Sequence, residues 1–496
     1  MTMEMSISAA MWFSLALVLV TALVAKIASR RRVTIGPLCT LLPAPPEVKG
    51  IMLLRLLPNL CTQGPEATMH YLHKKLGSAF TVSFLWRKTT FLVGQEASAI
   101  FFQGLESEVT QGSLFEFTVP MFGTEVGFGV DYATRREHTR FIVEALKPAQ
   151  FKNYVDPMIQ EVENYFGKWE DEGVVDLKKE FKEILMLISG RCLVGTEVRE
   201  KMFGQFCTLF HQIEEGLNFA SFMFPYIPIT VNRRRDSARI KLRAILAEVV
   251  RSRKSLNHAE EDVLQRFIDA TYKDGRGTTV EEVSALILTL IFAGKHSSAM
   301  TSTWTAACLL VHAKALDAAL EEQRKIIRKY QGMIDYNVLS QMDTLHGCIK
   351  EAARMHPAPP ALIRQVKKDI TVRTKEGNEY HVSRGHTLVH LVMLNGMLPH
   401  VYKDPEVYDP DRFLPGRGED KAAGKLSYTS FGAGRHACGG EAYAFMQIKI
   451  IFTHLLRNFE LKLVSPFPKP DWTQFLPEPK GKVMVSYKRR SLLSHA

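Results

Sequence analysis

One cysteine stands in a glycine-rich loop directly before a long helical pattern at 441–458. The loop reads Phe431-Gly-Ala-Gly-Arg-His-Ala-Cys-Gly-Gly440. Free N–H groups and the positive end of a helix dipole favour a thiolate at such a position. The glycines remove side-chain bulk, so that a planar ligand can approach the backbone. We therefore predict that Cys438 forms a thiolate, that Phe431 shields its sulfur, and that Arg435 and His436 meet anionic groups.

A second set of chemically capable residues lies inside a long apolar helical pattern at 280–315. The stretch Ala293-Gly-Lys-His-Ser297 places small residues next to a hydroxyl and an imidazole. Small residues leave space beside the helix, and a hydroxyl there can relay protons. We predict Ser297 and His296 as catalytic residues. The alternative for His296 is an ordinary polar residue of a helix.

A third motif pairs charges on one helix face. Glu351 and Arg354 are three residues apart, a spacing that brings their side chains together. Pro357 ends this helix, and Asp409-Pro-Asp-Arg412 follows further along the chain. Taken alone, the Glu–Arg pair is a commonplace surface ion pair.

Together, in this order, the three motifs resemble those of the cytochrome P-450 superfamily. The resemblance implies that Cys438 is the proximal ligand of a haem iron, where thiolate ligation favours cleavage of dioxygen. It also implies that Glu351, Arg354 and Arg412 form a structural lock beneath the haem. The implied activity is a monooxygenase that receives electrons from NADPH through NADPH–cytochrome P-450 reductase.

The two histidines His296 and His436 point to one branch of this superfamily, the sterol 14α-demethylases. Several segments are similar to its plant members: Phe224-Pro-Tyr-Ile-Pro, Arg233-Arg-Arg-Asp, Tyr272-Lys-Asp-Gly-Arg and Leu455-Leu-Arg-Asn-Phe. Arg364 matches a residue that pairs with a haem propionate in this family.

The sequence departs from this family where a substrate would bind. Phe115 replaces the usual Tyr, Glu125-Val126-Gly127 replaces Gly-Val-Val, and Gly129 replaces an acidic residue. Ser297 replaces the usual Thr, and Gly439 replaces an Ile. The resemblance implies that the pocket is lined by Phe115, Phe122, Val126, Phe128, Ala293, Leu362, Phe475 and Leu476.

Two explanations fit these departures: neutral drift in a working sterol demethylase, or a retained catalytic machinery with a reshaped pocket. We expect the second, in a divergent cereal-type member that hydroxylates or epoxidises a cyclic triterpene of the β-amyrin type in specialised metabolism. The alternative is 14α-demethylation of a sterol, obtusifoliol. A hydroperoxide isomerase tends to lack the hydroxyl of Ser297, and a sterol carrier needs no thiolate.

The elements that must position these residues are mostly helical. Helical periodicity covers about 135–147, 155–170, 198–216, 234–254, 259–273, 280–315, 337–356 and 440–458. Strand patterns are short: 79–85, 90–93, 370–372 and 483–487. We predict a mostly α fold with minor β structure, the single-domain haem-thiolate fold of the cytochromes P-450.

The N-terminus predicts a membrane anchor. No residue from Ser6 to Ala25 is charged, and Lys26 and Arg30-Arg-Arg32 follow. About 20 apolar residues cross a bilayer, and positive charge after them favours a cytosolic C-terminal side. We expect a single-pass protein of the endoplasmic reticulum membrane with its catalytic domain on the cytosolic face. The expected boundaries are 1–29 for the anchor, 30–47 for a basic, Pro-rich linker and 48–496 for the catalytic domain.

Composition excludes other classes. Of 496 residues, 46% are hydrophobic and 23% charged, too apolar for a disordered chain. The seven cysteines include no CxxC pair, which argues against a disulfide framework or a thiolate zinc site. The net charge of +11 fits a basic face for the reductase, with Arg435, Lys449 and Lys462 as candidates. No motif supports nucleic-acid binding. The apolar segment 219–229 is either a buried connector or a second contact with the membrane.

Overall fold

The computed structural model describes residues 42–84, 87–256, 259–490 and 492. The predicted anchor and most of the linker lie outside these residues. The chain forms two compact units, one from residues 42–110 with 363–391 and the other from residues 111–362 with 392–492. Because the first unit joins two distant segments, no break in composition marks it. The domain boundaries expected from the sequence remain a prediction.

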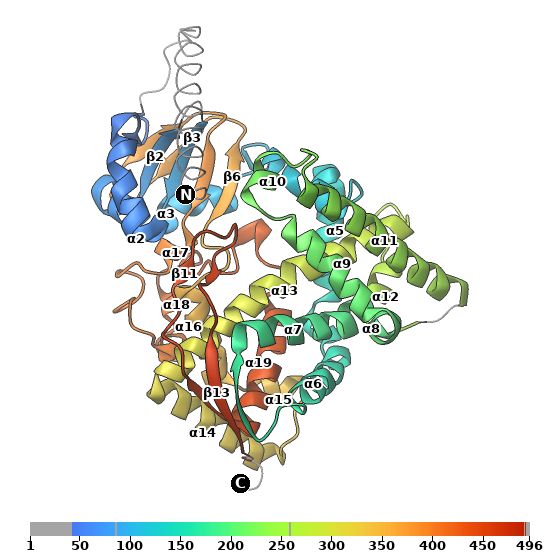
Figure 1. Cartoon of the computed structure of the whole chain (residues 1–496). Coiled ribbons are helices and arrows are strands. Elements are labelled where there is room, and N and C mark those ends of the chain that lie inside the picture. Colours follow the sequence, from blue (N-terminus) through green and yellow to red (C-terminus); the bar gives the residue numbers. More distant parts are fainter. Residues whose placement is uncertain (1–41, 85–86, 257–258, 491, 493–496) are drawn as a thin grey trace, which may run out of the picture. The chain divides into compact units, whose positions relative to one another are not determined.

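The first unit is built on a mixed sheet with strand order β1-β2-β3-β9-β6-β4, and α2 and α3 pack against its strands (Figure 1). β2 pairs antiparallel with β3, and β3 pairs parallel with β9. The strands predicted near 79–85, 90–93 and 370–372 are confirmed. The elements of this unit are β1 (Glu47–Val48), α2 (Ile51–Leu76), β2 (Ala79–Phe84), β3 (Arg87–Leu92), α3 (Gln95–Gln103), β4 (Val109–Thr110), β6 (Leu362–Val366), β7 (Ile370–Arg373), β8 (Glu379–Val382) and β9 (Thr387–His390).

The second unit is mostly helical. Its helices are α4 (Val119–Phe122), α5 (Tyr132–Ala145), α6 (Lys152–Phe166), α7 (Leu177–Ser189), α8 (Thr196–Lys201), α9 (Phe203–Glu215), α10 (Phe219–Met223), α11 (Thr230–Leu256), α12 (Val263–Ile268), α13 (Val280–Val311), α14 (Ala313–Tyr330), α15 (Tyr336–Ser340), α16 (Asp343–Met355), α17 (Val392–Asn395), α18 (Glu419–Ala422) and α19 (Glu441–Asn458). Short 3-10 or π turns are η1 (Gly112–Thr118), η2 (Gly127–Gly129), η3 (Pro148–Gln150), η4 (Gly190–Val194), η5 (Pro410–Phe413) and η6 (Gly434–His436). Its strands are β5 (Glu172–Asp176), β10 (Phe459–Leu463), β11 (Pro470–Asp471), β12 (Glu478–Pro479) and β13 (Met484–Arg489).

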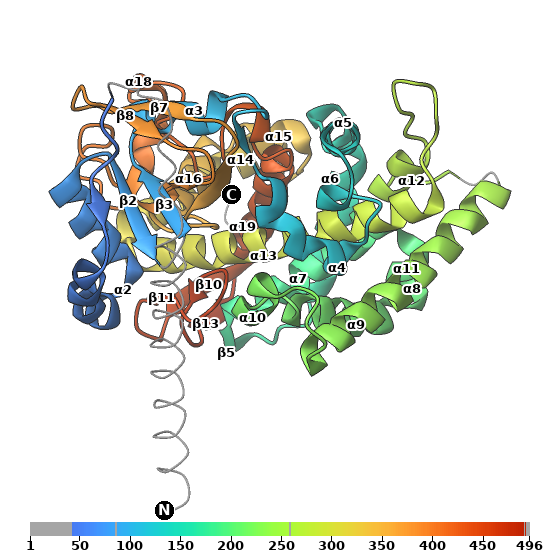
Figure 2. The same cartoon turned by 90° about the horizontal axis from the view of Figure 1, so that it is seen from above.

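Helix α13 is the central element of this unit. It begins at a capping box in which the Thr279 side chain accepts from the Glu282 N–H and the Glu282 carboxylate accepts from the Thr279 N–H. Helices α7, α11, α16 and α19 pack against it (Figures 1 and 2). Among the described residues, α13 is the one helix long and apolar enough to cross a membrane, but 61% of its apolar window is buried inside the protein. It is therefore the core helix of this unit.

A buried hydrogen bond ties α13 to α19. The Gln447 side-chain amide donates to Ser298 Oγ at 2.7 Å, and both residues are buried. The helix with the proposed oxygen-handling residues is thus fixed to the helix that follows the cysteine loop. Because a buried amide or hydroxyl without a partner is costly, this contact also fixes the register of the two helices.

The helical periodicity overestimated several lengths. The helices predicted at 198–216 and 337–356 are each broken, between α8 and α9 and between α15 and α16, and the one at 259–273 shrinks to α12. Helix α13 ends at Val311, where His312 leaves helical geometry, so the predicted 280–315 is four residues too long. Helices α2, α7 and α14 were not predicted. In α2, Pro58, Pro65 and the non-helical Gly64 obscure the pattern.

Candidate active site

The cysteine loop is closed by its own backbone. The Cys438 N–H donates to the Phe431 carbonyl at 2.8 Å, and Gly432 and Gly434 adopt positive φ values of 70° and 64° that favour glycine. The Phe431 ring lies 5.2 Å from that of Phe445, so it anchors the loop on α19. The loop thus holds the cysteine two residues before Gly440, the N-cap of α19, as the sequence predicts.

The thiol itself is not made acidic by this loop. Burial raises the pKa of Cys438, a hydrogen bond with the Gly440 backbone opposes that shift, and the Glu441 carboxylate adds to it. The thiolate expected at Cys438 from its place before α19 therefore stays a prediction. A bound metal cation would favour it, because a coordinating thiol is deprotonated by its metal.

The unusual Gly439 has a structural reason. A Cβ atom at this position would lie 3.1 Å from the Val143 side chain of α5. That distance is shorter than an ordinary van der Waals contact, so a branched side chain at 439 would have to displace Val143. The absence of a side chain at residue 439 therefore allows α5 to pack close to the cysteine loop.

The predicted lock is formed. Glu351 accepts from Arg354 Nε at 2.7 Å and from Arg412 Nε at 2.9 Å, and all three side chains have 0% exposure. The Asp409 N–H donates to the same carboxylate. Such a buried network specifies one arrangement, because each partner left alone would be a buried unpaired charge.

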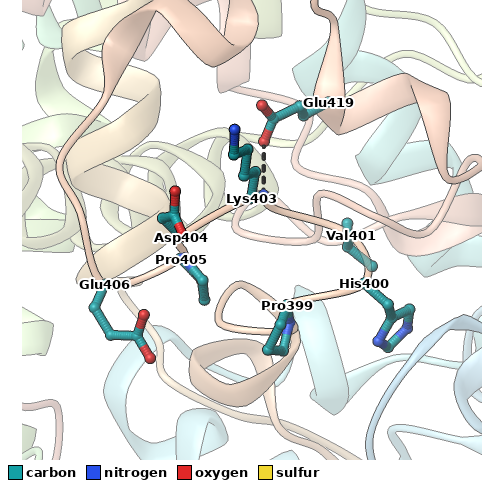
Figure 3. Close-up of a pocket in the computed structure, with 8 residues that line it drawn as sticks. All are labelled: Pro399, His400, Val401, Lys403, Asp404, Pro405, Glu406 and Glu419. Atoms are coloured by element: carbon teal, nitrogen blue, oxygen red, sulfur yellow. Dashed lines mark hydrogen bonds between the residues drawn. The ribbon is translucent and has the colours of Figure 1, made fainter.

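The two arginines also hold a neighbouring loop. Arg412 donates to the carbonyls of Lys403 and Val407, and Arg354 donates to that of Pro405. This loop borders a pocket of about 580 Å³, drawn in Figure 3, where the Lys403 N–H bonds Glu419. The residues that line it are Pro399, His400, Val401, Lys403, Asp404, Pro405, Glu406 and Glu419. The lock thus shapes the loop without bringing a catalytic residue of the predicted set into this pocket.

Arg364 lies in β6 of the first unit, with its guanidinium 4.8 Å from the centre of the Phe101 ring. It is 3% exposed, and burial lowers its pKa to about 10. Its Nε atom is buried without a hydrogen-bond partner among the described residues. A buried, unsatisfied cationic donor fits an anionic group such as a carboxylate of a bound ligand.

Ser297 and His296 of α13 differ in their hydrogen bonding. Ser297 Oγ donates to the Ala293 carbonyl one turn earlier at 2.8 Å. His296 Nε2 is buried and has no hydrogen-bond partner among the described residues. Burial, followed by the positive charge of Lys182, lowers the pKa of His296, so its imidazole is neutral at pH 7.

A cavity of about 1120 Å³ lies beside His296. It joins α7, α9 and α13 to the segment with Phe475 and Leu476, and of the predicted site residues it brings together these two with His296. The Phe475 ring packs on Phe117 of η1 and Phe222 of α10, with ring centroids 5.9 and 5.1 Å apart. Phe475 therefore joins the cavity to an aromatic cluster from three distant segments, although Phe117 and Phe222 do not themselves line the cavity.

The same cavity has charged residues that the sequence analysis missed. Lys295 pairs with Glu214 of α9 at 2.7 Å. Lys178 and Lys182 of α7 pair with Glu478, at 3.2 and 2.7 Å. Burial raises the pKa of Glu478, but the two lysines outweigh it and keep the carboxylate ionised. No local signal in the sequence identifies Lys295 and its partners, because these ion pairs join residues far apart along the chain.

The remaining pocket residues lie on other elements. Phe115 stacks on Phe128 with centroids 5.0 Å apart, and Phe122 meets Phe292 of α13 edge-on at 5.2 Å. Val126 is buried, and Leu362 stands at the start of β6. These residues and Ala293 do not line the cavity described above.

Two surface predictions change. Lys449 was a candidate for docking a reductase, but it is 6% exposed and donates to the Leu339 carbonyl at 2.8 Å, so this prediction is wrong. Burial lowers its pKa to about 8. Arg435 and Lys462 are exposed. In the segment 219–229, Phe224 and Tyr226 are 63% and 62% exposed, which rules out a buried connector.

The family model for cytochrome P-450 matches residues 43–485. The chain belongs to the cytochrome P-450 family. It is 48% identical to the obtusifoliol 14-alpha demethylase of Sorghum bicolor, over 90% of this chain and 91% of the relative. It is also 48% identical to the sterol 14-demethylase of Arabidopsis thaliana, over 87% of this chain and 88% of that protein. The lanosterol 14-alpha demethylase of Mus musculus is 30% identical, over 86% and 84%.

The fold comparison agrees. A solved structure of retinoic acid-bound cyanobacterial CYP120A1 matches with a TM-score of 0.77 and 21% identity, covering 91% of this chain and all of that one. The predicted fold class and the predicted place among plant sterol 14α-demethylases are therefore confirmed. The protein is a haem-dependent monooxygenase of this family.

The cysteine loop of the second unit fits the haem, because Cys438 supplies a soft sulfur ligand in a glycine-rich loop directly before α19. When bound, this group supplies activation of dioxygen with electrons that originate from NADPH and arrive through a reductase. The chain itself supplies binding, orientation and proton delivery.

Proposed function

We propose that this cytochrome P-450 removes the 14α-methyl group of a plant sterol of the obtusifoliol type. The observation that carries the proposal is the 48% identity to obtusifoliol 14-alpha demethylase over nine-tenths of both chains. Residues His296 and His436, whose presence in the sequence is typical of the sterol 14α-demethylase branch, lie in α13 and η6.

From the sequence we expected a triterpene as the substrate and a sterol as the alternative. The proposal reverses this order. Triterpene oxidation rested on changes in the pocket segments, and none of the relatives reported above is named for it. Changes at the pocket wall alter affinity by modest free energies, so they are compatible with a retained sterol substrate. Oxidation of a β-amyrin-type triterpene remains the second candidate, favoured only by the altered segment 115–129.

In this proposal the protein contributes three things. The cavity walls with Phe475 and Leu476 bind an apolar, polycyclic ligand. Ser297 holds a hydroxyl in the middle of α13, where it passes a proton on. His296, neutral at pH 7, accepts and returns protons on the cavity side of the same helix.

Separate incubations test the substrate. The full chain, reconstituted with NADPH–cytochrome P-450 reductase, is given obtusifoliol or β-amyrin, and the products are identified by mass spectrometry. We expect a 14-demethylated sterol from obtusifoliol. An oxidised triterpene from β-amyrin with no sterol product would contradict the proposal. Loss of the thiolate-type carbon monoxide band in Cys438→Ser, with the wild type retaining it, checks the ligand.

We also infer attachment to the endoplasmic reticulum membrane by the anchor at 6–25, with the catalytic part on the cytosolic side. A reductase would dock on a basic face that includes Arg435 and Lys462, both exposed. Such docking is electrostatic, so the rate of reduction should fall as ionic strength rises. A rate insensitive to salt would exclude this docking surface.

A second membrane contact belongs to the apolar segment around α10. Its exposed side chains are Phe219, Met223, Phe224, Tyr226 and Ile227. Exposed clusters of this kind mark interaction surfaces. In nanodiscs with brominated lipids, we expect a tryptophan placed by Phe224→Trp to be quenched. Leu256→Trp, at the exposed end of α11, is the control and should not be quenched.

A further inference from the structure

The changes in the pocket segment 115–129 form one structural unit. We name residues 123–129, between α4 and α5, the recognition turn. Gly123 and Gly127 adopt φ values of 111° and 58°, which favour glycine. A Cβ atom on Gly129 would lie 2.6 Å from the Thr124 backbone, so the turn folds back on itself and accepts only glycine there. The unusual Gly127 and Gly129 are therefore required by this one conformation.

The third change, Glu125, joins this turn to α11. Its carboxylate accepts two hydrogen bonds from Arg243, at 3.1 and 3.0 Å. The Arg243 and Glu125 side chains are 17% and 32% exposed. One helical turn earlier, Arg239 donates to the Pro120 carbonyl of α4 at 3.0 Å. Bidentate pairs of this kind are among the stronger ones, because both bonds are charge-assisted and directional.

Helix α4, directly before the turn, packs against α13. Phe122 of α4 and Val126 of the turn are buried, and the Phe122 ring lies edge-on against Phe292, one residue before Ala293. The turn is thus tied by charge to α11, and the helix that precedes it packs on α13, which contains the proposed proton-delivering residues. A shift of the turn would move both apolar side chains relative to α13.

We propose that the Glu125–Arg243 pair is a latch that fixes the recognition turn and determines substrate selectivity. It is a positioning device: it acts through Phe122 and Val126, which lie outside the cavity beside His296 and which the family resemblance places at the substrate, and not by contact with the reacting atoms. With the latch closed, these two side chains are held in one position and discriminate between polycyclic ligands by shape. When the Glu125–Arg243 pair is broken, the recognition turn can adapt to different ligands. The selectivity for one polycyclic ligand over another then falls. This inference rests on the proposed function, because it takes a sterol as the preferred ligand.

The experiment compares the wild-type full chain with Glu125→Gln, Arg243→Gln and the exchanged pair Glu125→Arg/Arg243→Glu. The control is Glu197→Gln, because Glu197 also accepts two bonds from one arginine of α11, Arg253, at 2.8 and 2.6 Å. Hydrogen exchange of residues 119–129 reports on the latch. Spectral titration with obtusifoliol and with β-amyrin gives the ratio of the two dissociation constants.

We expect exchange about fivefold faster in both single variants, and a ratio of dissociation constants about fivefold closer to one. The exchanged pair should recover both properties, and Glu197→Gln should leave both unchanged. Unchanged exchange or an unchanged ratio in the single variants overturns the proposal, as does an equal effect of the control. Absence of recovery in a folded exchanged pair also counts against it.

Failure of the proposed function is distinguishable from failure of the latch. A wild type that prefers β-amyrin refutes the sterol substrate, yet the ratio and the exchange rates still test the latch. A wild type that binds neither compound overturns the role in selectivity, whatever the exchange rates. Equal melting temperatures of the variants show that they are folded.

Discussion

At the scale of single residues, two serines of α13 make the same local hydrogen bond in different surroundings. Ser297 and Ser284 both donate to the carbonyl four residues earlier in α13, at 2.8 and 2.7 Å. Ser284 is buried near the start of the helix, whereas Ser297 follows the small residues Ala293 and Gly294. The same side chain with the same local bond thus occurs once in a buried position and once beside small residues, where we expect room for dioxygen.

This contrast defines the first prediction. Ser297→Ala should consume NADPH with little product, since proton delivery is lost while the fold is kept; we expect the yield of product per NADPH to fall about tenfold or more. Ser297→Thr should restore the yield, because it keeps the hydroxyl. The yield is measured as NADPH oxidised against product formed, with Ser284→Ala as the matched control. A fully coupled Ser297→Ala would exclude the relay.

At the scale of elements, charge pairs set the positions of helices and loops. Glu351 joins α16 to η5 through Arg354 and Arg412. The Arg412 guanidinium pKa is lowered by burial but raised more by Glu351 and Glu419, so its net shift is upward and it stays charged. Because Glu351, Arg354 and Arg412 are all buried, the loss of one of them removes a hydrogen-bonding partner of the others. The network is therefore stable only when all three are present.

The second prediction tests that network. Glu351→Gln leaves two buried arginines with half of their counter-charge removed, and we expect a loss of about 3–5 kcal/mol of unfolding free energy. Thermal and denaturant unfolding measure it. Glu321→Gln, which removes an exposed pair with Arg324 on α14, should cost about 1 kcal/mol or less. Equal effects of the two substitutions would show that the lock is not important for stability.

At the scale of the whole molecule, buried histidines link stability to pH. Burial lowers the pKa to about 3 for His346, His356 and His390 and to about 4 for His454. His356 stacks on Trp304 at 3.8 Å, and His390 is 0% exposed with Nδ1 2.7 Å from Ser98 Oγ. These side chains are neutral in the folded protein at physiological pH.

The third prediction follows from the sign of these shifts. In the unfolded chain a histidine binds a proton near pH 6.5, well above the folded pKa of 3 to 4. The unfolded state therefore takes up protons first, and the free energy of unfolding falls as the pH drops below 6.5. Each histidine contributes about 1.4 kcal/mol per pH unit.

Denaturant unfolding at pH 7.5, 6.5 and 5.5 measures this decline. His390→Asn should make the decline shallower, whereas His211→Asn, at an exposed position of α9, should not change it. A free energy of unfolding that stays constant or rises from pH 7.5 to 5.5 would contradict the prediction.

Features that depend on neighbours along the chain could be predicted from the sequence alone. The loop around Cys438, the capping box at Thr279 and the Glu351–Arg354 pair all join residues within a few positions, so their spacing encodes their geometry. The same motifs, read together, identified the family.

Contacts between residues far apart along the chain could not be predicted in this way. Glu125 and Arg243 are 118 positions apart, and Ser298 and Gln447 are 149 apart. Nor did sequence show that Lys449 is buried or that the segment 219–229 is exposed. Local patterns specify hydrogen bonds and periodic faces, whereas burial and long-range ion pairs depend on how those faces pack. The family and the class of reaction could therefore be predicted from the sequence, whereas the long-range contacts around the pocket segments could not.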